Sequence, residues 1–391
     1  MSEQDWCYVL YVLIYNWHSG FLKLFLETLI AHITTIEMMK PVSLFIGICM
    51  LTACDSISRQ VTDSVVEVDL SAAQPQFTIE KIVPLETTAE AFYDRFFKID
   101  IDQEHVFVQD RTRILVFDAG GKYLSRVERL GKGPQEYTYL INFCPFKDEL
   151  YIIRGDTKTI GVYAYDGRFI RSISLDFQPL DICVTDDYMA FQVASTEANS
   201  LIVTDREGKR LYEAVPPVQA QNTFEMAAFH PFVRSGNLVF FQPNYISEVY
   251  RIEKDKGENQ SFLFDFGPHT LTADYVSKIM SPNDFKTKLQ QDEKISYLNF
   301  QPAENWWNLN FYLGDMQYGW FYHPVSKKQY SVSKRDNPVA GRTVSATVGD
   351  CFVTAVEAWE FIEDPIYASW REGMRVEEND NAVLIYYTIK E

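Results

Sequence analysis

The sequence has few of the residues that build disulfide frameworks and metal sites. It contains 6 cysteines and 6 histidines among 391 residues. Asp100–Glu104 alternates carboxylates, but it lacks the turn glycine and the distal glutamate of a calcium loop. The histidines of the main part of the chain lack the HxH or HExxH spacing of a zinc site; they are His105, His230, His269 and His323. We therefore expect no bound metal.

Basic charge is scarce as well. The chain has 36 Lys and Arg against 54 Asp and Glu, a net charge of −18. This charge repels a phosphate backbone, so nucleic acid is not an expected partner. Gly131–Pro134 is not a phosphate loop, because no Ser or Thr follows Lys132 and Pro134 has no amide proton to donate. A G-x-S-x-G nucleophile elbow is also missing. These motifs assign no catalytic residue and leave the cofactor unknown.

Large apolar side chains, in contrast, are plentiful. Hydrophobic residues make up 47% of the chain and aromatic residues 15%. Burying that much apolar surface requires a large core, which excludes a disordered chain. From about residue 77 onward the hydrophobic residues alternate with polar ones, and helical periodicity is weak. This pattern predicts an all-β protein.

The N-terminal region is typical of a secretory leader. Lys40 precedes the apolar run Pro41–Met50, and Leu51–Cys54 follows with the sequence Leu-Thr-Ala-Cys. This ending resembles the bacterial lipobox, in which the cysteine is acylated and becomes the mature N-terminus. We expect residues 39–53 to be the signal peptide, Cys54 to carry lipid that binds the membrane, and residues 54–76 to form a tether. Residues 1–38 are an over-extended start or, alternatively, an extra membrane or amphipathic segment.

These predictions place the mature chain in a bacterial cell envelope, lipid-anchored to the outer membrane, with the periplasmic or surface side left open. Three cysteines remain beyond Cys54, namely Cys144, Cys183 and Cys351. Each lies in or beside an apolar, strand-like run. We expect buried free thiols rather than a disulfide framework.

Six strand-rich units repeat along the chain. Each unit has a hydrophobic strand, a short turn and a second strand, and the first two add an Asp-Gly turn. Units of this size predict a radial array, a six-bladed β-propeller of four-stranded antiparallel blades over residues 77–391. The units are 105–127, 149–173, 188–215, 237–267, 309–333 and 350–389.

Two stretches carry a family resemblance. Asp118–Lys122, followed by Arg129–Tyr137, resembles the "FD..GK…GxGPGEY" stretch of the six-bladed β-propeller lipoproteins common in Bacteroidetes, relatives of NHL-repeat propellers. Gln135 stands where that family usually has Gly. Asn381–Lys390 resembles the closing segment of the family, with Ala for Pro. The resemblance covers about residues 77–390, implies the propeller fold, and carries no established catalytic residues.

Strand accounting predicts how the ring closes. The last unit supplies three strands, and Phe77–Pro84 is expected to add the fourth, so that no ladder edge stays open. Two segments interrupt the strand pattern with short helical insertions. Leu271–Glu293 reads as two short helices separated at Pro282, and residues 356–380 read as a helical segment broken at Pro365.

In this register both insertions fall on the propeller face that carries Arg129–Thr138. Loops on a rigid scaffold are common binding sites, so this face is the expected site. Several candidates also have a structural alternative, since Glu136 and Tyr137 can lock the loop between blades and Trp359 and Trp370 can seat an insertion. The candidate ligand-binding residues are Arg111, Arg113, Lys132, Glu136, Tyr137, Arg154, Tyr245 and Trp320, with Trp359 and Trp370 in addition.

Two functions remain open at this point. The first is an envelope-anchored lipoprotein that binds a glycan, a peptide or a partner protein through its loop-rich face. The alternative is a propeller enzyme, either a metal-dependent, lactonase-like hydrolase or a polysaccharide lyase or hydrolase. The enzyme requires carboxylates from several blades to converge on the channel.

Overall fold

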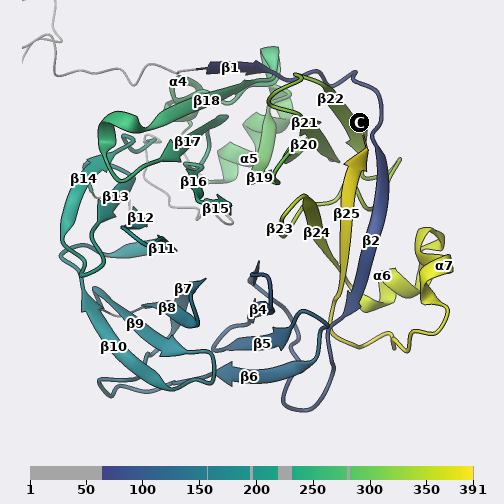
Figure 1. Ribbon diagram of the computed structural model, residues 1–391. Coiled ribbons are helices and arrows are strands. Elements are labelled where there is room, and N and C mark those ends of the chain that lie inside the picture. The colour runs from purple at the N-terminus through teal and green to yellow at the C-terminus, as the bar shows by residue number, and fades with distance from the viewer. Residues whose placement is uncertain (1–63, 156, 194–196, 219–230, 280–281, 391) are drawn as a thin grey trace, which may run out of the picture. The chain divides into compact units, whose positions relative to one another are not determined.

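Six four-stranded antiparallel sheets form a ring in the computed structural model (Figure 1). The structure describes residues 64–155, 157–193, 197–218, 231–279 and 282–390. The predicted six-bladed β-propeller is therefore confirmed. The predictions for the leader, for Cys54 and for the first part of the tether lie outside the described residues.

The blades follow one another along the chain, and each begins at the centre of the ring and ends at its outer wall (Figure 1). Blade I contains β3 (Lys98–Ile101), β4 (His105–Gln109), β5 (Ile114–Asp118) and β6 (Tyr123–Val127). Blade II contains β7 (Leu140–Phe146), β8 (Glu149–Arg154), β9 (Thr159–Ala164) and β10 (Phe169–Ser174). Blade III contains β11 (Pro179–Val184), β12 (Met189–Val193), β13 (Leu201–Thr204) and β14 (Arg210–Ala214).

The second half of the ring repeats this order. Blade IV contains β15 (Phe232–Ser235), β16 (Leu238–Phe241), β17 (Glu248–Ile252) and β18 (Gln260–Asp265), with the 3-10 turn η2 (Lys256–Glu258) before its last strand. Blade V contains β19 (Ile295–Pro302), β20 (Trp307–Leu313), β21 (Met316–Tyr322) and β22 (Gln329–Ser333). Blade VI contains β23 (Ala346–Val348), β24 (Cys351–Val356), β25 (Val383–Lys390) and β2 (Gln76–Pro84).

Burial along the strands follows their place in the blade. The middle strands β8 and β9 are buried on both faces, because each sheet packs between two neighbouring blades. The outer strands β6 and β10 alternate between exposed and partly buried residues. The continuous apolar runs of the sequence thus become middle strands, and the alternating runs become outer strands.

The glycines of two turns pack closely against the preceding blade. Gly121 and Gly208 lie in turns between third and fourth strands, with φ of 86° and 91°. A Cβ atom at Gly121 would lie 2.3 Å from the carbonyl oxygen of Pro84, and one at Gly208 would lie 2.8 Å from that of Ser174. Only glycine combines this positive φ with so close an approach to the outer strand of the preceding blade.

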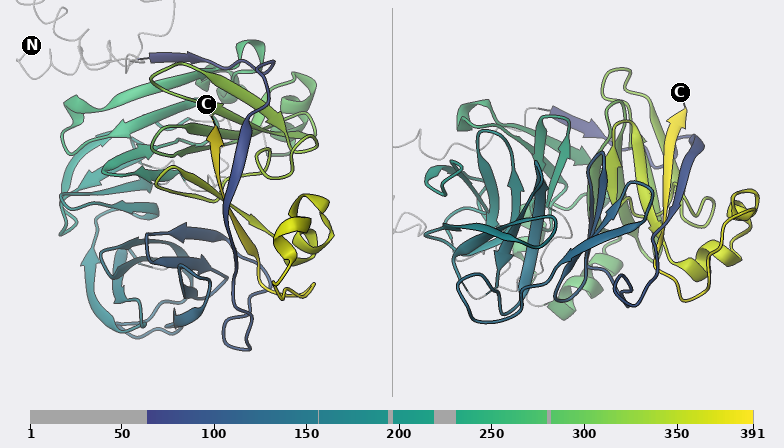
Figure 2. Two further views of the ribbon diagram at one scale, coloured as in Figure 1. Left: turned by 45° about the vertical axis from the view of Figure 1, so that its right-hand side comes forward. Right: turned by 60° about the horizontal axis from the view of Figure 1, so that its bottom comes forward.

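Blade VI combines strands from the beginning and from the end of the described chain, as predicted. β2 pairs antiparallel with β25 from Gln76 opposite Lys390 to Pro84 opposite Val383. In Figures 1 and 2 the two strands lie side by side along one wall of the ring. This pairing closes the ring, and β25 has a partner strand along both of its edges.

The described part of the predicted tether is bound to the propeller. β1 (Ser64–Glu67) pairs in parallel with β18, which gives blade IV a fifth strand. Further along, the Gln329 side chain accepts a hydrogen bond from the Asp69 amide at 2.9 Å and donates one to the Glu67 carbonyl at 2.8 Å. Residues 64–75, here called the belt, therefore follow the outer wall from blade IV over blade V to blade VI.

Both helical insertions are present. The first contains η3 (Gly267–His269), α4 (Ala273–Ser277) and α5 (Pro282–Gln291), and the Thr272 side chain caps α4 by accepting the amide of Tyr275. The second contains α6 (Ala358–Glu363), η4 (Pro365–Tyr367) and α7 (Ala368–Arg371). The breaks predicted at Pro282 and Pro365 are found.

The three cysteines in the described residues are free thiols. Cys144 and Cys183 are buried as expected, whereas Cys351 is half-buried. In the part of the chain that the structure describes, no helix has the length and apolar character needed to cross a membrane.

Candidate functional site

The loop-rich face of the propeller carries both insertions. Loops that lead from one blade to the next share this face with loops that join second to third strands, because these loops all start where strands of the same direction end. Figure 2 (right) shows the green α5 at the lower edge of the ring, opposite the C-terminus, and the yellow helical insertion projecting from the wall beside that edge. The prediction that the added segments share one face is confirmed. We call it the loop face.

The loop that carries the family motif is held shut by Tyr137. Its ring is 1% exposed, and its hydroxyl donates to the Thr112 carbonyl at 2.8 Å. Its amide donates to the Arg129 carbonyl at 2.9 Å, and its carbonyl accepts the Gly131 amide at 3.0 Å. Burial raises the pKa of Tyr137 well above its usual value. Tyr137 is therefore a neutral structural anchor of the loop.

Glu136 explains the two glycines of the motif. Its carboxylate accepts the Gly133 amide at 2.8 Å. A Cβ atom at Gly131 would lie 1.9 Å from a Glu136 carboxylate oxygen, and one at Gly133 would lie 3.0 Å from it. The loop thus folds over its own glutamate, as the structural alternative for Glu136 predicts.

Arg154 holds the same loop from blade II. It is 5% exposed, and its guanidinium donates to the Pro134 carbonyl and to the Ser172 hydroxyl, both at 3.0 Å. The hydroxyl of Tyr163 donates to the neighbouring Gln135 carbonyl at 3.1 Å. These bonds join blades I and II through the loop. They place Arg154 below the surface rather than on it.

Arg113 has a comparable supporting position. Its guanidinium donates to the Asp110 carboxylate at 2.7 Å, to the Phe92 carbonyl at 2.7 Å and to the Glu90 carbonyl at 3.3 Å. It therefore fixes the loop of residues 85–97, which enters blade I.

The aromatic candidates are also separated by the structure. Trp320 is fully buried, and its indole donates to Gln329 at 3.1 Å, so it lies in the core and not on the loop face. Tyr245 is half-buried against Phe285 of α5, with ring centroids 5.0 Å apart. Trp370 packs on the core beneath the second insertion, whereas Trp359 remains 47% exposed. The alternative in which a tryptophan seats the insertion thus applies to Trp370.

Two of the candidate residues have exposed side chains that a ligand can reach. Arg111 and Lys132 are exposed, and neither forms a hydrogen bond or ion pair within the described residues. Sequence reasoning missed three exposed aromatic residues on the same and adjoining loops, Phe92, Phe97 and Tyr139, which are 43%, 47% and 52% exposed. The doublet Phe96-Phe97 before a strand was the available signal. We call the exposed residues Phe92, Arg95, Phe97, Arg111, Lys132 and Tyr139 the loop-face patch.

Three adjoining loops support this patch. Arg113 binds the Phe92 carbonyl, and Tyr137 binds the carbonyl of Thr112, next to Arg111. Tyr139 lies over Gly155, where a Cβ atom would come within 1.9 Å of its ring. The buried side chains of the motif therefore set the positions of the exposed ones.

A second group of polar residues lies among the inner strands around the centre of the ring. The ammonium of Lys98 donates to the Phe143 carbonyl at 2.8 Å and to Asn142 at 3.1 Å, and it lies 3.9 Å from the Asp181 carboxylate. Burial raises the pKa of Asp181 to about 6, although Lys98 opposes this shift. Burial lowers the pKa of Lys98, but Asp181 and Asp100 outweigh it, so the pKa is raised overall.

Buried glutamines repeat at the loop-face ends of second strands. Gln109 donates to the Ile141 carbonyl at 3.2 Å, and Gln242 donates to the Leu298 carbonyl at 2.7 Å, each in the next blade. Gln192 likewise reaches an asparagine of blade IV at 3.3 Å. These amides join neighbouring blades around the ring.

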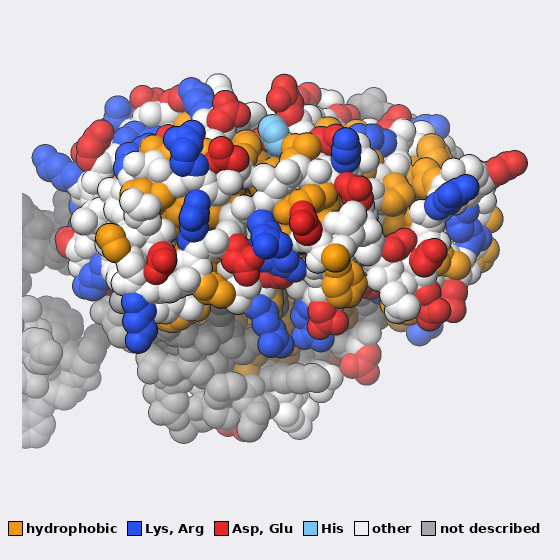
Figure 3. Space-filling view, turned by 90° about the horizontal axis from the view of Figure 1, so that it is seen from below, with side chains coloured by type: hydrophobic (Ala, Val, Ile, Leu, Met, Phe, Trp, Pro, Cys, Tyr) orange, Lys and Arg blue, Asp and Glu red, His pale blue; other side chains and the backbone are white. Residues whose placement is uncertain are grey.

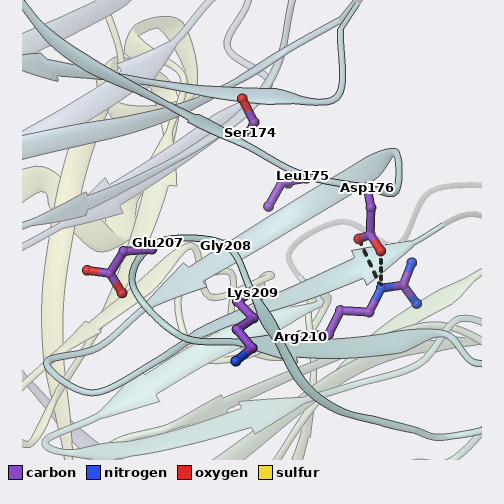
Figure 4. A pocket seen from close by; sticks show the side chains of 7 residues that line it. All are labelled: Ser174, Leu175, Asp176, Glu207, Gly208, Lys209 and Arg210. Carbon is purple, nitrogen blue, oxygen red and sulfur yellow. Dashed lines mark hydrogen bonds and ion pairs between the residues drawn. The ribbon is translucent and has the colours of Figure 1, made fainter.

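Two open depressions lie at blade joints on the outer wall. One, of about 580 Å³, lies between blades II and III, where Asp176 pairs with Arg210 at 2.9 Å (Figure 4). Another, of about 380 Å³, lies between blades I and II beside Arg129 and Gly167. On the part of this wall that Figure 3 shows, acidic and basic side chains are interspersed. These joints are explained by blade packing.

The residues do not suggest a metal centre at any of these places. Within the described ranges, no group of three or more His, Cys, Asp or Glu side chains is arranged to hold a metal ion.

A closed ring of six blades with one elaborated face defines a six-bladed β-propeller. The chain belongs to the family described as domain of unknown function DUF4934, whose model matches residues 67–388. No curated protein matches the chain.

Two solved structures share the fold. One is a protein of Bacteroides fragilis, assigned as exported, with 16% identity and a TM-score of 0.69 over 84% of this chain and all of that one (100%). The other is a member of the DUF4221 family from Bacteroides vulgatus, with 9% identity and a TM-score of 0.51 over 82% of this chain and 100% of that one.

Proposed function

We propose that the chain is an exported lipoprotein, anchored in the cell envelope through lipid on Cys54. The Leu51–Cys54 sequence and the apolar run before it support this proposal. The assignment of the similar B. fragilis protein as exported agrees with it. The belt begins at Ser64, so a tether of about ten residues would link the lipid to the outer wall.

Replacing the lipidated residue tests the anchor. We expect Cys54→Ser to abolish acylation, so that the chain stays unprocessed or leaves the membrane fraction. Membrane fractionation and the mass of the mature N-terminus measure both effects. Cys351→Ser, in a half-buried position of blade VI, is the matched control and should fractionate as the wild type does. Two results together would refute the anchor. The Cys54→Ser variant would stay in the membrane fraction with residues 1–53 still attached, and the wild-type chain would carry no acyl mass.

We further propose that the propeller is a binding module and that the loop-face patch contacts the ligand. The observation that carries this proposal is that adjoining, well-held loops expose three aromatic rings together with Arg111 and Lys132, which form no ion pair with the described residues. Flat rings pack on the apolar faces of sugars, and arginine and lysine donate hydrogen bonds to hydroxyl and carboxylate oxygens. A glycan is the ligand class that this combination favours, and a peptide or envelope protein is the other outcome to test.

Alanine substitutions in the patch test this site. We expect Arg111→Ala, Lys132→Ala and Phe97→Ala each to weaken binding about tenfold or more, with a melting temperature close to that of the wild type. The reason is that these side chains are exposed and support no described contact of the fold. A glycan array together with a pull-down from envelope extract identifies the ligand, and titration then gives the dissociation constants.

Two controls make the result specific. Lys327→Ala, in the turn between the last two strands of blade V, lies on the opposite face and should leave binding unchanged. Tyr137→Phe should lower the melting temperature, because it removes the hydroxyl bond to Thr112. A ligand that maps to the opposite face would contradict the site while leaving the propeller intact.

A further inference from the structure

The inner strands of blades II, III and V each contain a β-bulge at the end that starts from the loop face. The register with the second strand shifts within residues 140–143 of β7, within residues 179–181 of β11 and within residues 296–299 of β19. A bulge leaves an extra residue without a partner in the ladder and turns the side chains beside it. The same irregularity thus occurs three times around the centre of the ring (Figure 1).

The bulge of blade V differs from the other two in its backbone. Tyr297 has φ of 52°, whereas the residues of the bulges in blades II and III stay outside the positive-φ region. A bulky side chain is rarely found at positive φ, because this conformation costs free energy. The other two bulges show that the fold does not require it. Backbone strain of this kind is concentrated at binding and active sites.

Buried amide side chains hold the backbone of this bulge in place. Gln242 of blade IV is 7% exposed, donates to the Leu298 carbonyl at 2.7 Å and accepts the Phe300 amide at 3.0 Å. Asn299 donates to the Val344 carbonyl, in the segment that enters blade VI, at 3.0 Å. Both neighbouring blades therefore fix the chain directly after the strained tyrosine.

The strained residue presents its ring to the solvent. Tyr297 is 58% exposed, and its hydroxyl forms no hydrogen bond within the described residues. Its ring stands edge-to-face against that of Tyr312, with centroids 5.8 Å apart and planes at 75°. Tyr312 is half-buried, and its hydroxyl donates to Gln317 at 3.4 Å. The exposed ring is therefore supported by a second ring that is itself held in the fold.

The segments that carry these two tyrosines, residues 293–298 and 311–316, offer no free cation. Their one basic residue is Lys294, whose ammonium donates to the Pro268 carbonyl and lies 5.1 Å from the centre of the Tyr275 ring. Acidic Glu293 and Asp315 lie on the same segments. An anionic group is therefore a poor fit here, and a neutral group with an apolar face is a good one.

We propose that Tyr297, supported by Tyr312, is a stacking platform for a neutral sugar ring at the centre of the loop face. A flat, fixed tyrosine ring packs on the apolar face of a sugar. The platform belongs to blade V and is separate from the loop-face patch on the loops of blades I and II. The inference deepens the proposed function and rests on it for the glycan as ligand class.

Titration of the full chain with neutral hexasaccharides tests the platform. The probes are cello-, malto-, laminari-, manno-, chito- and galactohexaose. We expect the wild type to bind at least one of them, Tyr297→Asn to weaken that binding about fivefold or more, and Tyr297→Phe to keep it within about twofold, because the ring remains. Asparagine tolerates positive φ better than tyrosine, so Tyr297→Asn should melt at or above the wild-type temperature. A lower melting temperature with unchanged binding would show that Tyr297 is structural and that the platform is wrong.

A matched control and a second variant make the result specific. Lys327 is also exposed and has φ of 63°, but it lies on the opposite face, so Lys327→Asn should leave hexasaccharide binding unchanged. Binding that is weakened by Arg111→Ala and not by Tyr297→Asn would refute the platform and leave the loop-face patch standing. The reverse result would support the platform and refute the patch. Absence of binding of all six probes to the wild type would refute the platform, whereas the glycan array still decides the patch.

Discussion

Deletion of β2 (Gln76–Pro84) is expected to unfold the whole propeller. This strand forms the outer edge of blade VI and pairs with β25 along its whole length. It also buries Ile82 and Val83, which are 7% and 2% exposed. Eight paired positions at about 1 kcal/mol per hydrogen bond, with about 2 kcal/mol for each apolar side chain, give a loss on the order of 10 kcal/mol. That loss equals the whole stability of a typical protein.

Circular dichroism and size-exclusion chromatography measure the outcome. We expect the deletion variant to lose its cooperative melting transition and to aggregate through the exposed edge of β25. A monomeric deletion variant that melts cooperatively near the wild-type temperature would show that β2 does not close the ring.

Moving the strand provides the matched control. Gln76 lies opposite Lys390 at the end of the ladder, so a two-residue turn can join Lys390 to Gln76. A permuted chain that starts at Leu85 and carries β2 after this turn should melt cooperatively again. Since it lacks the belt, its reference is an unpermuted chain that starts at Gln76. Recovery to that level would locate the effect in the pairing itself.

The sequence was sufficient to predict the ring because the information is local and repeated. Strand alternation and the Asp-Gly turns recur in the first two blades, and Gly121 explains why the turn needs glycine at the joint. The closing role of Phe77–Pro84 followed from counting strands in the last unit. Each of these predictions uses only the spacing of residues along the chain. None of them requires knowing where a side chain lies in space.

The candidate site was predicted only in part, because the needed information depends on contacts between blades. Arg154 is charged and reads as exposed, but backbone carbonyls of the motif loop bury it. Trp320 reads as a ligand-stacking ring, yet it fills the core between blades. The belt reads as a polar tether, because its partner β18 lies far along the sequence. Arg111 and Lys132 are exposed as expected, because the exposure of a loop residue depends little on packing between blades, and their contact with a ligand stays a prediction.

The buried pair Lys98 and Asp181 gives the second large expected effect. Lys98→Met should destabilise the protein by about 3–5 kcal/mol at pH 7.5, because it leaves the carboxylate of Asp181 buried without its cation. The exposed pair of Asp176 and Arg210 is the matched control, with Asp176 67% exposed. Asp176→Asn should cost no more than about 1 kcal/mol.

The pH dependence of this effect follows from the raised pKa of Asp181. Burial raises this pKa from 3.8 to about 6 in the folded state, so folding favours the protonated acid. The resulting stabilisation is complete below about pH 4 and is lost as the pH rises through 6, with a size of about 3 kcal/mol. Asp181→Asn cannot titrate and should remove this fall in stability between pH 4.5 and 7.5, whereas Asp176→Asn should retain it.

Combining the two substitutions with pH makes the argument specific to the buried pair. At pH 4.5 Asp181 is mostly neutral, so Lys98→Met leaves no unpaired charge, and its cost should fall below about 2 kcal/mol. Without the cation, the pKa of Asp181 rises further, so the variant loses stability more steeply than the wild type as the pH increases. Urea unfolding at both pH values measures the four free energies. An equal cost of Lys98→Met at pH 4.5 and 7.5 would mean that Lys98 contributes through packing and hydrogen bonds and that the charge of Asp181 does not matter.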